Sequence, residues 1–142
     1  MSESMTIRVN TGAILINVED LTGEKIGEFK FNPADVGILD RYEKVVEFFN
    51  SIHIPSDISE SQKADEARKL NSDIADQMSY LLGYDASSKM FSRCGALALT
   101  DAGTFFFENI LDSIGGLIEK TTKKRVEKKL AKIRKATAKY TS

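Results

Sequence analysis

Two side chains are of types that could act as a nucleophile or a general base, and neither stands in a catalytic pattern. His53 is the single histidine of the chain and Cys94 is the single cysteine. A Ser-His-Asp arrangement places the histidine between a nucleophile and a carboxylate, and only Asp57 follows His53 closely in sequence. Arg93 precedes Cys94 and could activate its thiol, but a cysteine without a spacing motif is usually a small buried residue. We therefore expect a protein that is not an enzyme.

Motifs for metals and phosphates are also missing from the sequence. It has no CxxC pair, no HxxxH pair and no carboxylate-rich loop with EF-hand spacing. Its glycines form neither GxxxxGK[ST] nor GxGxxG. We expect no metal and no cofactor. A single cysteine cannot form an internal disulfide, which fits a reducing, cytoplasmic setting.

Charge is divided sharply along the chain, although the net charge is only −1. Residues 1–119 carry ten basic and twenty acidic side chains, whereas residues 120–142 carry ten basic side chains and one acidic. The two parts therefore have net charges of −10 and +9. Within the basic part, Val126, Leu130 and Ile133 recur at helical spacing, which predicts a basic amphipathic helix.

This basic helix has four interpretations. It has no tryptophan and a modest apolar stripe, which disfavours a membrane surface, and no stretch of the chain is apolar for long enough to span a bilayer. Nonspecific contact with nucleic acid needs only positive charge, but the acidic body would repel phosphates. A solvated helix without a partner is the plainest alternative. Docking on an acidic protein surface, including the body of another copy, agrees best with the charge distribution.

The run Phe105-Phe106-Phe107 cannot face one way on a helix. Phe106 shares helical spacing with Ile110 and Ile114, which predicts a core position. The other two phenylalanines either widen a buried face or form a subunit contact, because exposed aromatic side chains mark interfaces. The predicted partner-binding residues are these three phenylalanines together with the basic side chains Lys123, Lys124, Arg125, Lys128, Lys129, Lys132, Arg134 and Lys135.

The length of 142 residues fits one domain with three segments: a β-hairpin region (1–31), a helical body (32–119) and a basic helix (120–142). Apolar alternation predicts strands over Ile14–Val18 and Ile26–Phe31, joined by a turn at residues 20–23. Met5–Val9 alternates in the same way and is a candidate third strand. We predict an α+β fold, in which an N-terminal β-hairpin or small antiparallel sheet packs on three to four amphipathic helices.

Capping residues and apolar spacing predict where the helices begin and end. Asn32 is expected to be the N-cap of a first helix that ends near Ser51. A second helix is expected to begin near Ser59 or Ser61 and to end at Gly83. A short turn or helix follows over residues 85–91.

A third helix is expected after a cap at Thr100 or Asp101. Gly115 and Gly116 lie near its middle, where they predict a bend or close packing against a neighbour. The helix either continues into the basic segment or restarts at Thr121-Thr122.

Four short motifs follow one another in the second half of the chain. A helix ends in Leu82-Gly83, an element Lys89-Met90-Phe91 follows, a helix begins with phenylalanines, and a basic helix ends near Lys139-Tyr140. In this order they resemble the small tail assembly chaperones of long-tailed bacteriophages and prophages. The resemblance covers residues 82–142 well, and the strand–helix N-terminal half in outline.

The resemblance implies a non-enzymatic protein of the bacterial host cytoplasm. Such proteins coat the long helical tape-measure protein and keep it soluble before tail-tube subunits polymerise around it. The implied partners are the tape-measure protein, the tail-tube protein and further copies of the chain, without a membrane. A frameshifted longer form is common in that family. The alternative is a small nucleic-acid-binding or regulatory protein that uses the basic helix.

Overall fold

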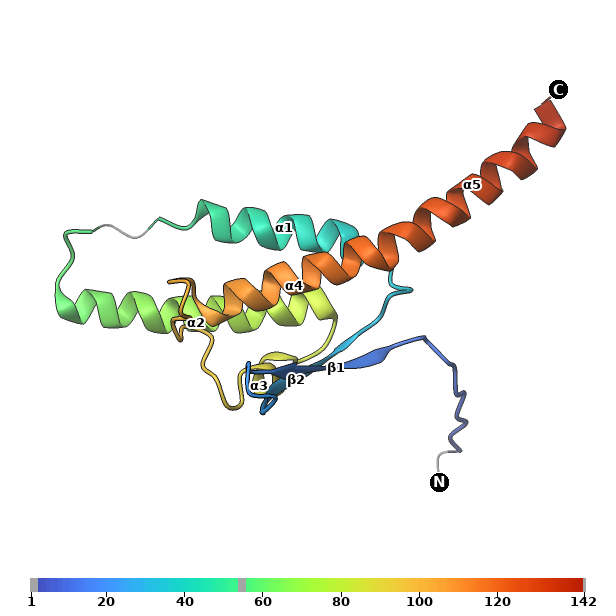
Figure 1. Cartoon of the computed structure of the whole chain (residues 1–142). Coiled ribbons are helices and arrows are strands. Elements are labelled where there is room, and N and C mark those ends of the chain that lie inside the picture. The colour runs from blue at the N-terminus through green and yellow to red at the C-terminus, as the bar shows by residue number, and fades with distance from the viewer. Residues whose placement is uncertain (1–2, 54–55, 142) are drawn as a thin grey trace.

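The computed structural model describes residues 3–53 and 56–141, with side chains as far as Arg134. The elements in chain order are β1 (Ile14–Glu19), β2 (Lys25–Phe31), α1 (Ile38–Ser51), α2 (Glu60–Leu82), α3 (Ser87–Met90), α4 (Phe106–Lys120) and α5 (Thr122–Thr141). Helices α1, α2 and α4 lie together, the sheet and α3 lie below them in Figure 1, and α5 projects away. The predicted α+β class is confirmed.

The hairpin forms as the apolar alternation predicts. β1 and β2 pair antiparallel, with Ile16 opposite Phe29 and Ile14 opposite Phe31. The turn is held by the Asp20 carboxylate, which accepts hydrogen bonds from the backbone and side chain of Thr22 at 2.8 and 2.6 Å. These bonds, led by the one from the Thr22 hydroxyl, hold the pKa of Asp20 below its ordinary value.

The prediction of a third strand over Met5–Val9 is wrong, because residues 3–13 form no strand. The side chains of Met5 and Ile7 are 97% and 87% exposed. Local hydrogen bonds take up the next backbone groups, since the N–H of Gly12 donates to the Asn10 side chain at 3.0 Å. A strand needs a partner for its backbone as well as an alternating pattern.

The first helix begins five residues later than the N-cap prediction requires, because the observed N-cap is Gly37. Asn32 accepts the N–H groups of Ala34 and Asp35 at 3.0 and 3.1 Å, so it organises a turn and not a helix. α1 begins at Ile38 and ends at Ser51, as predicted for its C-terminus. Arg41 then joins this turn to α2, because it pairs with Asp35 and donates to the backbone carbonyl of Leu81.

The second helix is confirmed at both ends. Ser59 and Gln62 form a reciprocal capping box at the start of α2, and Gly83 ends the helix in the left-handed conformation. The short helix α3 follows, and its Met90 is fully buried.

The predicted caps of the third helix, Thr100 and Asp101, are wrong. They lie in a tight loop closed by a bridge between Leu99 and Phe105. The first N–H groups of α4 are satisfied by the preceding linker, because Phe106 and Phe107 donate to the carbonyls of Ala98 and Ala96. The sequence predicted a side-chain cap, whereas two backbone carbonyls of the linker accept the hydrogen bonds that such a cap would accept.

The core lies between helices α1, α2 and α4 and the sheet. Its buried side chains are Phe29, Phe31, Ile38, Val45, Ile74, Met78, Leu81, Ala86, Met90, Ala96, Phe106, Phe107, Ile110, Leu111, Ile114 and Ile118. The two glycines of α4 differ within it. A Cβ at Gly115 would lie 2.3 Å from the hydroxyl oxygen of Tyr42, whereas a Cβ at Gly116 would meet no atom within 4 Å. Of the two predicted alternatives, close packing is confirmed.

We predict opposite effects for alanine at these neighbouring positions. Gly115→Ala forces Tyr42 off α4 and is expected to lower the free energy of unfolding by about 1–2 kcal/mol, because overpacking exceeds the helix-propensity gain. Gly116→Ala should raise it by up to about 1 kcal/mol. Urea denaturation measures both. Adding Tyr42→Phe should relieve part of the Gly115→Ala loss, and equal effects at the two glycines would contradict the contact.

Candidate partner-binding site

An apolar groove opens where the C-terminal end of α1 meets the N-terminal end of α4. Its volume is about 490 Å³. The groove is floored by apolar side chains and edged by polar ones, and its lining residues are Val46, Phe49, Asn50, Ile52, Leu70, Thr104, Phe105, Phe107, Glu108, Leu111 and Asp112. An apolar hollow with a few polar groups at its edge is typical of a site that accepts side chains of a partner.

Aromatic rings shape this groove. Phe107 packs against Phe49 of α1 with ring centroids 5.0 Å apart, and Phe105 stacks on Phe107 at 6.1 Å. The N–H of Phe105 donates to the Glu108 carboxylate at 2.7 Å, which orients the residue just before α4 begins. The rings form a rigid wall and leave the space beside it open.

Negative charge borders the groove on the α4 side. Glu108 and Asp112 are exposed and lie one helical turn apart. Burial raises the pKa of Tyr42 above its ordinary value, and the charge of Asp112 adds to this effect. A basic or amphipathic partner segment would therefore match the groove better than an acidic one.

The structure separates the predicted phenylalanines. Phe106 and Phe107 are 7% and 5% exposed and belong to the core, and Phe106 packs edge-on against Phe91. Phe105 is half-buried and contributes to the groove. A surface role for this run therefore concerns Phe105 directly, and Phe107 as part of the groove wall.

Sequence reasoning missed most of the groove. Phe49, Leu70 and Leu111 have apolar spacing that is typical of core positions, and nothing in that spacing shows which of them lie beside a gap. The sequence also did not indicate that Glu108 lies at the rim of a groove, because a glutamate in the first turn of a helix is common.

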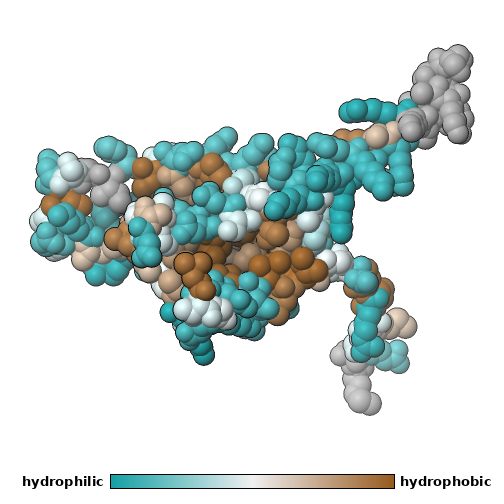
Figure 2. Space-filling view, viewed as in Figure 1, coloured by the Kyte–Doolittle hydropathy of each residue, from teal (hydrophilic) through white to brown (hydrophobic). Residues whose placement is uncertain are grey.

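The basic helix α5 is the second surface. It leaves the end of α4 and projects from the bundle, and Figure 2 shows mostly hydrophilic side chains on its described part, with a few hydrophobic ones toward its far end. Its basic side chains are exposed as far as Arg134, while Lys135 lies outside the described side chains. Leu130 and Ile133 of its apolar stripe are 45% and 50% exposed. The predicted basic residues therefore do lie on one element, and they lie apart from the phenylalanines.

A one-residue interruption sets the direction of α5. Of the two predicted alternatives, the helix restarts: Thr121 leaves the helical conformation between α4 and α5. The Thr121 hydroxyl donates to the carbonyl of Leu117 at 2.6 Å. The hydroxyl of Thr122 is fully buried and has no hydrogen-bond partner within the described chain.

The candidate catalytic residues are not brought into a catalytic arrangement. His53 is exposed at a small hollow of about 140 Å³ formed with Glu66, Lys69 and Asp73, whose lining includes no hydroxyl or thiol. Cys94 is half-buried, and the neighbouring Arg93 is paired with Glu24 at 3.3 Å. The described residues hold no group of three metal-ligating side chains.

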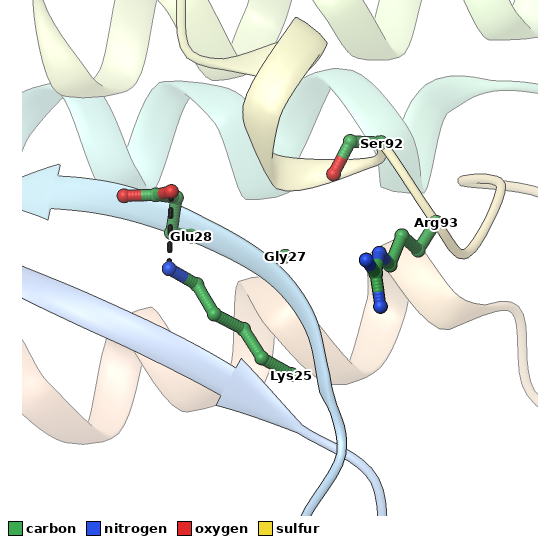
Figure 3. Close-up of a pocket in the computed structure, with 5 residues that line it drawn as sticks. All are labelled: Lys25, Gly27, Glu28, Ser92 and Arg93. Carbon is green, nitrogen blue, oxygen red and sulfur yellow. Dashed lines mark hydrogen bonds and ion pairs between the residues drawn. The ribbon is translucent and has the colours of Figure 1, made fainter.

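A second hollow, of about 290 Å³, lies between β2 and the loop after α3 (Figure 3). Lys25 and Arg93 both line it, but each is already paired with a carboxylate, Lys25 with Glu28 at 3.1 Å and Arg93 with Glu24. Such exposed pairs contribute little to stability. The hollow therefore offers no uncompensated charge among its lining residues.

Comparison with known proteins adds no relative: no family model, no curated protein and no solved structure matches the chain. Among the described helices, none is both long and apolar enough to cross a membrane. The site must therefore be interpreted from its own geometry.

The two threonines at the α4–α5 junction give a stability prediction. Thr122→Val should raise the free energy of unfolding by about 1 kcal/mol, because it removes a buried hydroxyl that no described group satisfies. Thr121→Val, the matched control, should lower it by about 1 kcal/mol through loss of the bond to Leu117. Guanidinium titration measures both changes. A loss of stability in both variants would show that the Thr122 hydroxyl is hydrogen-bonded.

Proposed function

We propose that this chain is a non-enzymatic tail assembly chaperone of a long-tailed phage or prophage, which binds the tape-measure protein in the host cytoplasm and helps to recruit tail-tube subunits. The observation that carries the proposal is the pairing of two docking surfaces on one small bundle. One is the apolar groove at the start of α4, and the other is the basic amphipathic helix α5 at its far end.

The groove supports a helical client. Helix-in-groove recognition places a few apolar side chains, spaced three or four residues apart, into a hydrophobic hollow. A groove of about 490 Å³ has room for such anchors and for little more. Contact of this size is weak for each copy, which suits a coat that must leave when the tube forms.

α5 supports a client of complementary charge. Its described basic side chains lie on a projecting helix. Lys123, in the first turn of α5, forms an ion pair with Glu119 of α4 at 3.3 Å. Exposed positive charges that repel one another on a helix are stabilised by an acidic partner surface. Such a surface also accelerates association.

Pull-down from cells that express the whole genetic locus tests the proposal, with nuclease present and at moderate salt. We expect the tagged chain to retain one very long protein rich in helical segments. Recovery of nucleic acid alone, and only without nuclease, would instead support the alternative that α5 binds phosphates. In that case affinity would fall steeply as salt rises.

Charge reversal identifies the part played by α5. Replacing Lys128, Lys129 and Lys132 with Glu should weaken client binding at least tenfold, because repulsion replaces attraction at the docking face. The matched control is Lys44, Lys63 and Arg68→Glu, which makes the same change in net charge at exposed positions of α1 and α2. Titration calorimetry with the purified client should show less than a twofold change for the control. Equal losses in both variants would mean that net charge, and not α5, controls binding.

A further inference from the structure

The sheet has two edges, and the described part of the chain occupies only one of them. On the outer side of β2, the N–H of Lys30 donates to the Tyr84 hydroxyl at 2.6 Å. Lys30 lies opposite Leu15 of β1. Because the N–H of Lys30 points out of the sheet, these two residues form a pair that exchanges no hydrogen bonds with each other. The N–H of Leu15 therefore also points out of the sheet, on the other side. By the same alternation, Asn17 presents its backbone groups at this outer edge of β1, where no described residue bonds to them.

At the same edge, the side chains on the core face of the sheet are only partly covered. Phe29 and Phe31 of β2 are 2% and 1% exposed. Their partners on β1 are less covered: Ile16 is only half-buried, and Ile14 is 46% exposed. Figure 2 shows hydrophobic side chains at the surface over the sheet. An open edge with apolar side chains is a template for another strand.

The segment Met5–Val9 has the pattern that this edge requires. Met5, Ile7 and Val9 alternate with polar residues, and they are 97%, 87% and 72% exposed. Antiparallel addition to β1 can place Met5 beside Val18, Ile7 beside Ile16 and Val9 beside Ile14. All three then extend the core face, while Thr6 and Arg8 lie beside Asn17 and Leu15 on the outer face.

The connection to β1 directs this segment away from its own sheet. Gly12 has a φ of +77°, and side chains of Asn10 and Thr11 accept the N–H groups of Gly12 and Ala13. Figure 1 shows the N-terminal segment leaving the end of β1 and running away from the sheet. A short connection that holds a strand apart from its own edge is the arrangement that favours exchange between copies.

We propose that the N-terminal segment Met5–Val9 of one copy adds to the β1 edge of a second copy as a third strand, and that the exchange is reciprocal. Two donated strands and two receiving edges would bury on the order of 1,600 Å² in total, the standard size of a specific interface. The dimer is independent of the proposed chaperone activity, because it uses neither the groove nor α5.

Disulfide trapping tests the pairing directly. In a Cys94→Ser background, one tagged chain carries Thr6→Cys and a second, untagged chain carries Asn17→Cys, and the two are co-expressed and oxidised. These positions are opposite one another on the outer face in the proposed register. We expect a disulfide-linked heterodimer on a non-reducing gel. The control pair, Ile7→Cys with Asn17→Cys, places the thiols on opposite faces and should not link.

Placing Thr6→Cys and Asn17→Cys in one chain separates exchange from folding back. A linked dimer supports the proposal. A monomer lighter by two hydrogens shows that the strand returns to its own sheet, and it overturns the proposal, as does recovery of free thiols alone.

Dimer dissociation provides a second measurement without cysteines. Ile7→Asp places a charge on the core face and should raise the dimer dissociation constant at least tenfold in sedimentation equilibrium. Thr6→Asp, its neighbour on the outer face, should change it less than threefold. A monomeric unmodified chain, or a dimer indifferent to Ile7→Asp, would overturn the exchange.

Discussion

The contact between Tyr42 of α1 and Gly115 of α4 sets the geometry on which the rest of the bundle depends. The missing side chain at Gly115 lets α1 approach α4 closely. Further along the same pair of antiparallel helices, Phe49 faces Phe107 across a ring distance of 5.0 Å. The ring pair lies between the helices beside the groove, and the glycine lies where the two helices make their close contact. The groove is the space beside the rings that no side chain fills.

Helix α4 also separates the two docking surfaces. Its fifteen residues extend about 22 Å, with the groove at its beginning and α5 at its end. The acidic rim formed by Glu108 and Asp112 and the basic side chains of α5 are thus kept apart within one copy, although their charges are complementary. This separation leaves both surfaces accessible to other molecules.

The hairpin shows how a small sheet depends on what covers it. One face packs on the helices through Phe29 and Phe31, and at the outer edge of β2 the N–H of Lys30 is satisfied by the Tyr84 hydroxyl. The β1 edge has no such cover among the described residues, and two strands alone are marginally stable. The backbone groups at that edge are open to solvent or to another strand, so the edge offers a place for association.

Local signals in the sequence determined the hairpin, the capping box at Ser59, the end of α2 at Gly83 and the basic amphipathic helix. In each case, residues within a few positions satisfy one another, so spacing suffices. Only the tertiary structure decided the start of α4, because carbonyls of Ala96 and Ala98 replace the expected caps at Thr100 and Asp101. The same is true of Met5–Val9, which alternates like a strand but forms no strand in the described chain. The groove was equally beyond the sequence, since apolar spacing shows which side chains turn inward and does not show where packed helices leave a gap.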